Sequence, residues 1–231
     1  MVDISASVLA KLQNKAKETG RSYQLCLQLF CQEEFLRRVS LSKYASNLIL
    51  KGGLFIYTLT GFESRVTVDI DFGIGDIIVP NPETRKIPTQ LTGFTQPEII
   101  TYSLESTIAE KFDAIITRFE FTSRMKDFYD IYYLAHTFNF EGGKLQEAIF
   151  STLQNRGTNY DIETMKTIEG LSLFNPMNTR WKAFLRRMKT TEPEFNEVLE
   201  LMQKFLKPVF DARLNEQEFS GQWNCGAMEW D

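Results

Sequence analysis

Histidine and cysteine are scarce in this chain of 231 residues. His136 is the single histidine, which argues against His-based zinc chemistry and against a Ser-His-Asp triad. The cysteines are Cys26, Cys31 and Cys225, an odd and scattered set with neither a disulfide framework nor the spacing of a metal site. Thiols of this kind favour a reducing compartment, so we expect a cytoplasmic protein.

Long apolar runs and an excess of positive charge are also missing. No uninterrupted apolar stretch is long enough to span a membrane, and the N-terminus lacks the apolar region of a signal peptide, so no membrane partner is expected. The net charge of −4 argues against a broadly basic nucleic-acid binder but leaves room for a local basic groove. Hydrophobic residues make up 43% of the chain, which is enough for a substantial core.

The periodicity of the apolar residues predicts an α+β fold, with a small sheet flanked by helices and a helical C-terminal region. A first helix should end at Gly20, and Ser22 should cap a second one. A short helix should follow Gly52-Gly53. Strands are expected at residues 66–72, 77–79 and 99–102, with a proline-rich loop over 80–98 and helices from 104 almost to the end. We expect residues 1–102 and 103–231 to form the two regions of one compact unit.

A pair of glycines followed by two alternating aspartates is the most informative pattern in the chain. Gly52 and Gly53 form the pair, and Asp69 and Asp71 are separated by one residue in a stretch rich in valine and isoleucine. Alternate side chains of a strand point to one face, so the two carboxylates would project together and favour a cation such as Mg²⁺. Paired glycines let a phosphate approach the backbone at the start of a helix. The pattern predicts a nucleotidyltransferase site, although Asp-x-Asp and Gly-Gly taken separately are also common in surface loops.

Two charged residues fall on apolar helix faces further along the chain. At about 100° per residue, Lys111 lies midway between Leu104 and Ile115, and Asp127 lies inside the apolar arc of the next helix, with Asp130 at its edge. A buried ammonium is costly and needs an anionic partner, either a carboxylate or a phosphate. The alternatives are a purely structural Lys111–Asp127 ion pair, or a lysine that extends to water.

These blocks together resemble the AbiEii-type toxin family of nucleotidyltransferases. That family belongs to the DNA polymerase β-like superfamily and occurs in bacterial abortive-infection and toxin–antitoxin systems. The resemblance covers most of the chain and rests on residues 50–53, 65–71, 103–111 and 123–130. The last two blocks are specific in combination.

The resemblance implies transfer of a nucleotide from an NTP with Mg²⁺, in some members to the tRNA acceptor end, and a cognate antitoxin as partner. Its metal-binding carboxylates correspond here to Asp69 and Asp71, and its motif lysine and later aspartate correspond to Lys111 and Asp127. We predict these four residues to be catalytic. The residues predicted to bind the nucleotide are Lys51, Gly52, Gly53, Arg65 and Thr67.

The chain departs from the family pattern in its middle. Family members usually carry a long segment between the first Asp-x-Asp and a second acidic strand, whereas residues 71–80 here already resemble that second strand. An internal deletion would produce this arrangement and would remove or displace the usual third carboxylate. Asp76 is the nearest substitute, but the loop-forming Gly73 and Gly75 precede it and leave the direction of its side chain open.

A basic cluster near the C-terminus has two interpretations. Arg180, Lys182, Arg186, Arg187 and Lys189 surround Trp181 and other apolar residues, a mixture that can hold RNA. The periodicity favours the simpler interpretation, an amphipathic helix with Trp181 in the core and a solvated basic face. The sequence does not decide whether Trp223 and Trp230 are buried. For the whole chain, the hypotheses are a nucleotidyltransferase toxin, a shortened and inactive relative that binds a nucleotide or another protein, and a structural helical domain.

Overall fold

The first two helices form where the sequence predicts them. In the computed structural model, which describes residues 4–60, 69–74 and 77–231, α1 (Ile4–Thr19) ends before Gly20 and α2 (Tyr23–Ser40) begins after Ser22. Gly20 has φ +68°, the left-handed conformation that ends many helices. Ser22 Oγ accepts a hydrogen bond of 3.2 Å from the Leu25 backbone N–H. The predicted stop and the predicted cap are therefore both confirmed.

A mixed four-stranded sheet follows. Its strands are β1 (Ile49–Lys51), β2 (Asp71–Gly73), β3 (Glu83–Lys86) and β4 (Glu98–Thr101), in the order β2-β1-β4-β3. β1 is parallel to β4, whereas the β1–β2 and β3–β4 pairs are antiparallel. The helix α3 (Gly52–Leu59) starts directly after β1, so the glycine pair lies at a strand-to-helix junction.

The strand predictions are right in part. β4 confirms the strand expected near 99–102, but residues 77–79 form no strand, so that prediction is wrong. Val79 satisfies its backbone on the first turn of α4 (Leu104–Ile116) instead: its N–H donates to Ser106 Oγ at 2.8 Å, and its carbonyl accepts from Ser103 Oγ at 2.8 Å. β3, in contrast, forms inside the predicted proline-rich loop, because the neighbouring prolines fall outside its four paired residues.

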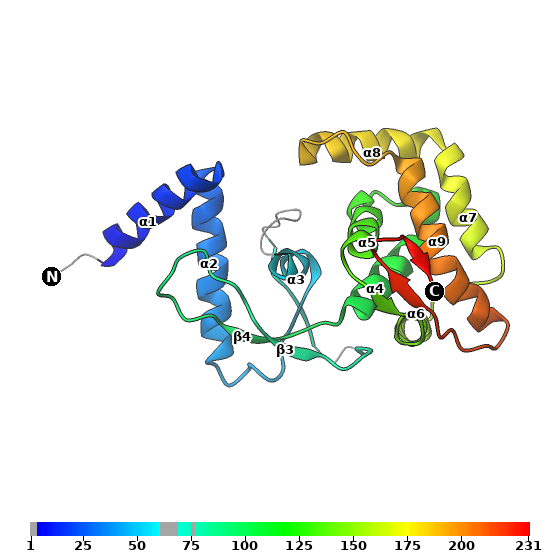
Figure 1. Cartoon of the computed structure of the whole chain (residues 1–231), viewed down its shortest axis with the longest axis horizontal. Coiled ribbons are helices and arrows are strands. Elements are labelled where there is room, and N and C mark those ends of the chain that lie inside the picture. Colours follow the sequence, from blue (N-terminus) through cyan, green and yellow to red (C-terminus); the bar gives the residue numbers. More distant parts are fainter. Residues whose placement is uncertain (1–3, 61–68, 75–76) are drawn as a thin grey trace. The chain divides into compact units, whose positions relative to one another are not determined.

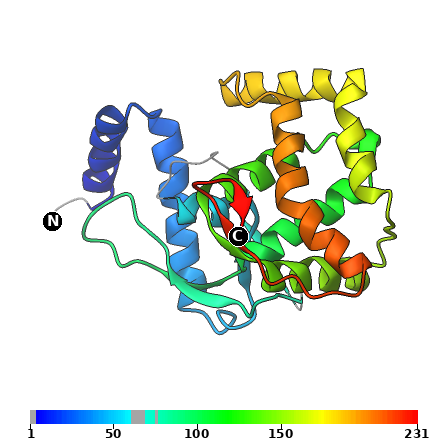
Figure 2. The same cartoon turned by 45° about the vertical axis from the view of Figure 1, so that its right-hand side comes forward.

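The chain divides into two units, one comprising Met1–Asp76 and Pro82–Tyr102 and the other Ile77–Asn81 and Ser103–Asp231. In the first unit α1 packs against α2, and α2 contacts β4 (Figure 1). A small core joins Leu12 and Ala16 of α1 to Cys26 of α2 and to Leu91, which lies in the connection between β3 and β4. Figure 2 shows that connection running beside α1 and α2.

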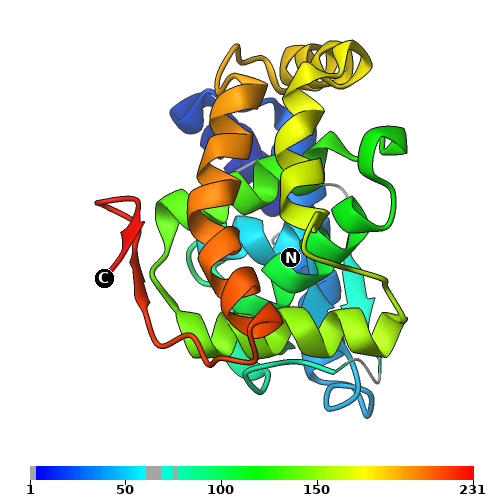
Figure 3. The ribbon, with the colours of Figure 1, turned by 90° about the vertical axis from the view of Figure 1, so that its right-hand side faces the viewer.

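The second unit is helical. After α4 come α5 (Met125–Thr137), α6 (Gly142–Arg156), α7 (Thr164–Gly170), α8 (Asn175–Met188) and α9 (Phe195–Leu214), with short 3₁₀ turns η1 (Phe119–Phe121) and η2 (Leu171–Leu173). α4 packs on α5 and α6, and α9 packs on α5, α6 and α7. In Figure 3, α7 and α9 lie side by side and α8 crosses above their ends. In the described ranges, the helices are all too short or too polar to cross a membrane.

The C-terminus adds a second, antiparallel sheet, which the sequence did not predict. β5 (Phe140–Glu141), β6 (Gln222–Asn224) and β7 (Glu229–Trp230) pair in that order. Trp223 is buried and donates its indole N–H to the Ala135 carbonyl at 2.7 Å, while Trp230 donates to the Phe205 carbonyl at 3.0 Å. Both tryptophans therefore anchor the tail to the helices. With a mixed sheet and a helical C-terminal region, the predicted α+β class is confirmed.

Candidate functional site

The junction between β1 and α3 brings one glycine of the pair against one of the two aspartates. Lys51 is paired with Asp71 across the β1–β2 ladder. Gly52 follows with φ +72°, and a Cβ added there would overlap the Asp71 carboxylate and lie 3.0 Å from the Asp71 Cβ. A side chain at residue 52 is thus excluded both by the backbone conformation and by the aspartate beside it. Gly52 is what allows the Asp71 carboxylate to lie against the start of α3.

The start of α3 favours negative charge. The first backbone N–H groups of a helix have no partner within the helix, and the helix dipole places partial positive charge at this end. Gly52 and Gly53 supply two of these N–H groups without side chains that would cover them. Phosphate groups commonly bind at such helix ends. The junction therefore combines a helix N-terminus, which favours anions, with an exposed carboxylate from Asp71.

Lys51 adds a positive charge to the same junction. Its Nζ donates to Tyr102 Oη at 3.3 Å and lies 5.0 Å from the centroid of the Tyr102 ring. Tyr102 follows β4 and is buried. A cation–π contact and a hydrogen bond thus hold the lysine against Tyr102. The sequence pattern did not reveal this partner, because Tyr102 is distant from Lys51 in sequence.

Asp69 lies just before β2 rather than in it. Asp69 and Asp71 are both exposed, whereas Ile70 and Phe72 are half-buried, and the Phe72 ring lies 6.4 Å from that of Phe35 on α2. The alternation expected from the sequence thus appears in the exposure of the side chains, although the strand itself begins only at Asp71. Arg65, Thr67 and Asp76, which were also predicted at this site, lie outside the described residues.

The chemistry of the two aspartates fits a divalent cation. Carboxylate oxygens are the ligands that Mg²⁺ takes, usually one or two from the protein, with water and substrate phosphate completing its coordination. Within residues 4–60, 69–74 and 77–231, no group of three or more His, Cys, Asp or Glu side chains is arranged to hold a metal. The described part of the chain thus offers a pair of carboxylates rather than a closed protein cage.

The second unit holds the other two predicted residues. Lys111 on α4 is buried, and its Nζ lies 2.7 Å from Asp130 Oδ2 and 3.6 Å from Asp127 Oδ1. Both aspartates project from α5 and are buried. Lys111 and Asp127 therefore lie close together, as in the ion pair that the sequence left as one alternative, but the nearest partner of the lysine is Asp130, which the helical wheel placed only at the edge of the apolar arc.

Asp127 has a second cationic partner. Arg124 Nε lies 2.6 Å from Asp127 Oδ2, just before the first turn of α5. Charges of opposite sign thus alternate along the series Asp130, Lys111, Asp127 and Arg124, in which the two aspartates and the lysine are buried and Arg124 is exposed. Balanced pairing is what makes buried charges tolerable. This geometry supports a structural role for the pair, in addition to the catalytic role that the motif implies.

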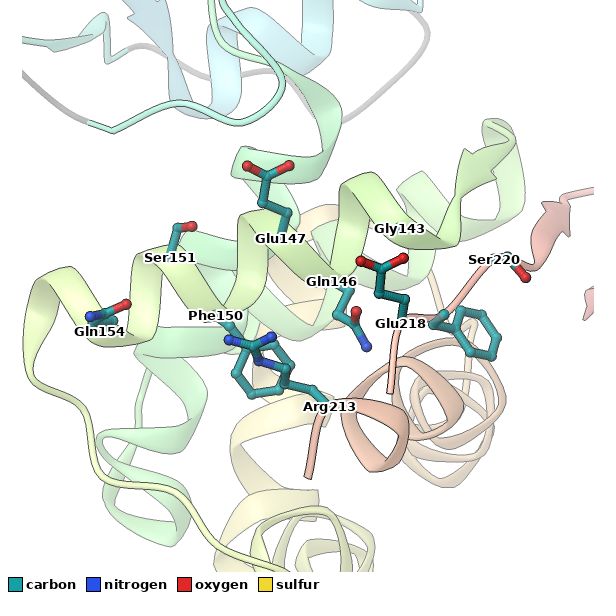
Figure 4. Close-up of a pocket in the computed structure, with 10 residues that line it drawn as sticks. Gly143, Gln146, Glu147, Phe150, Ser151, Gln154, Arg213, Glu218 and Ser220 are labelled. Carbon is teal, nitrogen blue, oxygen red and sulfur yellow. The ribbon is translucent and has the colours of Figure 1, made fainter. Parts of the chain in front are cut away.

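A separate pocket of about 460 Å³ lies in the second unit (Figure 4). α6 supplies Glu147 and Phe150 to its wall, Arg213 comes from the end of α9, and Glu218 follows that helix. The guanidinium of Arg213 lies 5.8 Å from the centroid of the Phe150 ring. None of the residues predicted from the sequence lines this pocket.

Comparison with known proteins places the chain in a family. The family model described as "Nucleotidyl transferase AbiEii toxin, Type IV TA system" matches residues 34–78 and 72–212. The two matched segments share residues 72–78 and together extend over most of the chain. Neither a curated protein nor a solved structure gives a match. From the extent of the family match, the chain belongs to the AbiEii nucleotidyltransferase toxins of type IV toxin–antitoxin systems.

Proposed function

We propose that this protein transfers a nucleotide from an NTP to an acceptor hydroxyl, such as that at the 3′ end of tRNA, and that a cognate antitoxin counteracts it. The observation that carries the proposal is the contact between Gly52 and Asp71 at the start of α3. It places a carboxylate beside a helix end suited to phosphate, which is the combination that a metal-bound triphosphate requires.

Each residue of the junction has a part in this proposal. Asp69 and Asp71 would hold Mg²⁺, which when bound neutralises charge on the triphosphate and orients it. The N–H groups of Gly52 and Gly53 would bind phosphate oxygens, and Lys51, held by Tyr102, would add positive charge. The sequence motif adds Arg65 and Thr67 as further nucleotide-binding residues.

The reaction itself is an in-line displacement. The acceptor hydroxyl oxygen forms a bond to the α-phosphorus, the bond from that phosphorus to the bridging oxygen breaks, and pyrophosphate leaves with the electron pair. The hydroxyl proton passes to a base or to solvent. Lys111 and Asp127 are proposed to take part in turnover because they occupy the motif positions of the family, and this part of the proposal is tested separately by substitution.

The overlap of the two family matches favours one alternative. A family segment that is absent between them would leave residues 72–78 matched twice, as the sequence pattern also suggests. A chain without that segment would lack part of the substrate cleft and a third carboxylate. It would then act as an inactive relative that binds a nucleotide or another protein.

Thermal unfolding with and without Mg²⁺ and each of the four NTPs tests the site. A ligand that binds only the folded state raises the melting temperature, by linkage. We expect a rise with at least one NTP, and we expect Asp69→Ala combined with Asp71→Ala to abolish it. The matched control, Glu216→Ala with Glu218→Ala, removes two exposed carboxylates at the same spacing and should keep the shift.

Incubation with labelled NTPs and total tRNA then separates the enzyme from its inactive relative. Labelling of tRNA that depends on Asp69 would establish transfer. A melting shift without labelling of any acceptor would support the binding protein, and no shift with any NTP would contradict the proposed site.

The three cysteines are free thiols, which supports a cytoplasmic location for the reaction.

A further inference from the structure

Helix α8 exposes a set of cations without anions. Lys182, Arg186 and Arg187 on α8 and Lys189 at its end are all exposed. Their side chains form no ion pair with any residue in the described ranges. From residue 170 to residue 191 the sequence contains no aspartate or glutamate. The whole chain has a net charge of −4, whereas α8 carries only positive charges.

Helix stability explains only part of this charge. Cations in the last turn interact favourably with the helix dipole, which accounts for Arg186 and Arg187. It does not account for Lys182 in the middle of the helix, or for the lack of any acidic residue in the first turn, where the dipole favours one. Like charges four residues apart, such as Lys182 and Arg186, cost roughly 0.2–0.5 kcal/mol per pair.

The apolar side of α8 is already occupied. Trp181 is buried, its indole N–H donates to the Pro193 carbonyl at 2.8 Å, and its ring lies 5.3 Å from that of Phe195 on α9. Met177, Phe184 and Leu185 are buried as well. The interpretation of this helix as amphipathic with Trp181 in the core is confirmed, and the free surface of α8 is therefore polar and basic.

The cations form rows along the helix. At about 100° per residue, Lys182 and Arg186 fall within about 40° of one another, and the rise of about 1.5 Å per residue separates them by about 6 Å along the helix. Lys189 follows at the C-cap of α8, in the left-handed conformation. Arg180 and Arg187 form a second row on the far flank of the exposed arc. Guanidinium groups can also bind phosphate through two parallel hydrogen bonds.

An exposed aromatic residue lies at one end of this surface. Arg180 Nη1 donates to the Thr122 carbonyl at 3.2 Å, which ties α8 to the end of the η1 turn. Phe121, the neighbour of Thr122, is 82% exposed. This link brings residue 121 to the Arg180 end of the basic surface, and exposed aromatic rings and cations together bind unpaired bases and their phosphates.

We infer that the basic surface of α8, consisting of Arg180, Lys182, Arg186, Arg187 and Lys189, docks the phosphate backbone of a nucleic-acid acceptor, with Phe121 available to stack on a base. This inference rests on the proposed function, because it supposes that the acceptor is a nucleic acid. An anionic membrane is a poorer match, since helices that bind membranes insert a free apolar face, and the apolar face of α8 is buried in the fold.

Fluorescence anisotropy with labelled tRNA, in the absence of NTP and Mg²⁺, tests the inference on the full chain. The variant combines Lys182→Gln, Arg186→Gln and Lys189→Gln. The control combines Lys144→Gln, Lys204→Gln and Lys207→Gln on α6 and α9. Each set removes three positive charges, so the net charge changes from −4 to −7 in both. We expect the α8 variant to bind about 10- to 100-fold more weakly, with a salt dependence shallower by about 2 in log K against log salt. Phe121→Ala should weaken binding further with no change in salt slope.

The outcomes separate this inference from the proposed function. Equal loss in the control and in the α8 variant would show a general charge effect and overturn the inference, as would unchanged binding in the α8 variant. Binding to phosphatidylserine vesicles through the same cations, without binding to tRNA, would also overturn it. Loss of RNA binding in the α8 variant, together with an NTP-dependent melting shift like that of the parent, would support it. If the parent shows no NTP-dependent melting shift but still binds tRNA through α8, the proposed nucleotide site is wrong, whereas the docking surface on α8 is supported.

Discussion

At the scale of single residues, two constraints make glycine the only residue type that fits at position 52 without strain. Its φ of +72° is costly for any residue with a Cβ, by about 1–2 kcal/mol, and a Cβ there would collide with the Asp71 carboxylate. We therefore predict that Gly52→Ala lowers the free energy of unfolding by more than the backbone cost alone and removes the NTP-dependent melting shift. Urea denaturation and thermal shift measure the two effects.

Gly20 provides the matched control for this substitution. It has φ +68°, but a Cβ there would meet nothing within 4 Å. Gly20→Ala should cost only about 1–2 kcal/mol and keep the melting shift. If the two alanine variants are equally stable and both respond to NTP, the contact between Gly52 and Asp71 has no part in binding.

Lys111 is the residue at which catalytic and structural interpretations meet. Because its ammonium lies 2.7 Å from Asp130 and 3.6 Å from Asp127, Lys111→Met would remove a cation from two buried carboxylates. We predict a loss of about 3–5 kcal/mol in the free energy of unfolding. Adding Asp130→Asn to Lys111→Met should recover much of this lost stability. The free energy of unfolding of the double variant should therefore exceed the value expected from adding the losses of the two single variants.

Activity measurements then separate the two roles of Lys111. A double variant that folds like the parent but transfers no nucleotide would show that the lysine acts in the reaction. Restored transfer would make the cluster purely structural. A Lys111→Met protein as stable as the parent would contradict the ion-pair assignment.

At the scale of elements, α2 carries a buried carboxyl group that links stability to pH. Burial raises the pKa of Glu33 to about 7, although Glu33 Oε1 accepts a hydrogen bond from the Gln90 N–H and Arg37 lies nearby. Glu33 Oε2 is buried and has no hydrogen-bond partner among the described residues. The pKa of Glu33 in the folded state thus exceeds the value of 4.5 for a free carboxyl. Between pH 4.5 and about pH 7, the folded state therefore binds more protons than the unfolded state.

The sign of the effect follows from this proton uptake. The contribution of Glu33 to stability is fully present below about pH 4.5 and is lost as pH rises through about 7. We predict a fall of at most about 1.4 kcal/mol per pH unit in this window, and a flatter profile for Glu33→Gln. Urea titrations of both proteins from pH 5 to pH 8 measure it. Profiles of equal slope would show that Glu33 does not titrate there.

The C-terminal sheet is the element in which long-range packing matters most. Trp223 is buried and bonded to the Ala135 carbonyl, whereas Trp230 is only half-buried and stacks on Phe205. We predict that Trp223→Ala costs about 3–5 kcal/mol and Trp230→Ala clearly less. Denaturation followed by far-UV circular dichroism tests this order. Equal and small losses would mean that the tail contributes little to the second unit.

Sequence patterns predicted the elements whose causes are local. The cap by Ser22 and the stop at Gly20 depend on neighbours within a few residues, so both could be predicted. Val79 instead bonds to Ser103 and Ser106 on α4, and a period-2 pattern contains no information about that partner. Within the site, the wheel placed Lys111 and Asp127 inward, but the choice of Asp130 as nearest partner depends on how α4 and α5 pack.

At the scale of the whole molecule, charge is divided between two kinds of candidate surface. The β1–α3 junction combines a carboxylate with a helix N-terminus, whereas α8 presents cations alone. The first arrangement suits a metal-bound triphosphate and the second a polyanion. The net charge of −4 reveals neither surface, because it is the sum of all charges in the chain.

This division predicts two distinct kinetic defects in nucleotide transfer to tRNA. The α8 variant with Lys182, Arg186 and Lys189 replaced by Gln loses docking charge but keeps the junction, so its KM for tRNA should rise about 10- to 100-fold while its rate at saturating tRNA stays near that of the parent. The variant with Asp69→Ala and Asp71→Ala should keep its affinity for tRNA and lose turnover at every tRNA concentration. Steady-state transfer of labelled NTP over a range of tRNA and salt concentrations measures both defects. If high tRNA concentration cannot restore the α8 variant, the cations act in the reaction rather than in docking, and the two surfaces do not have the separate tasks inferred here.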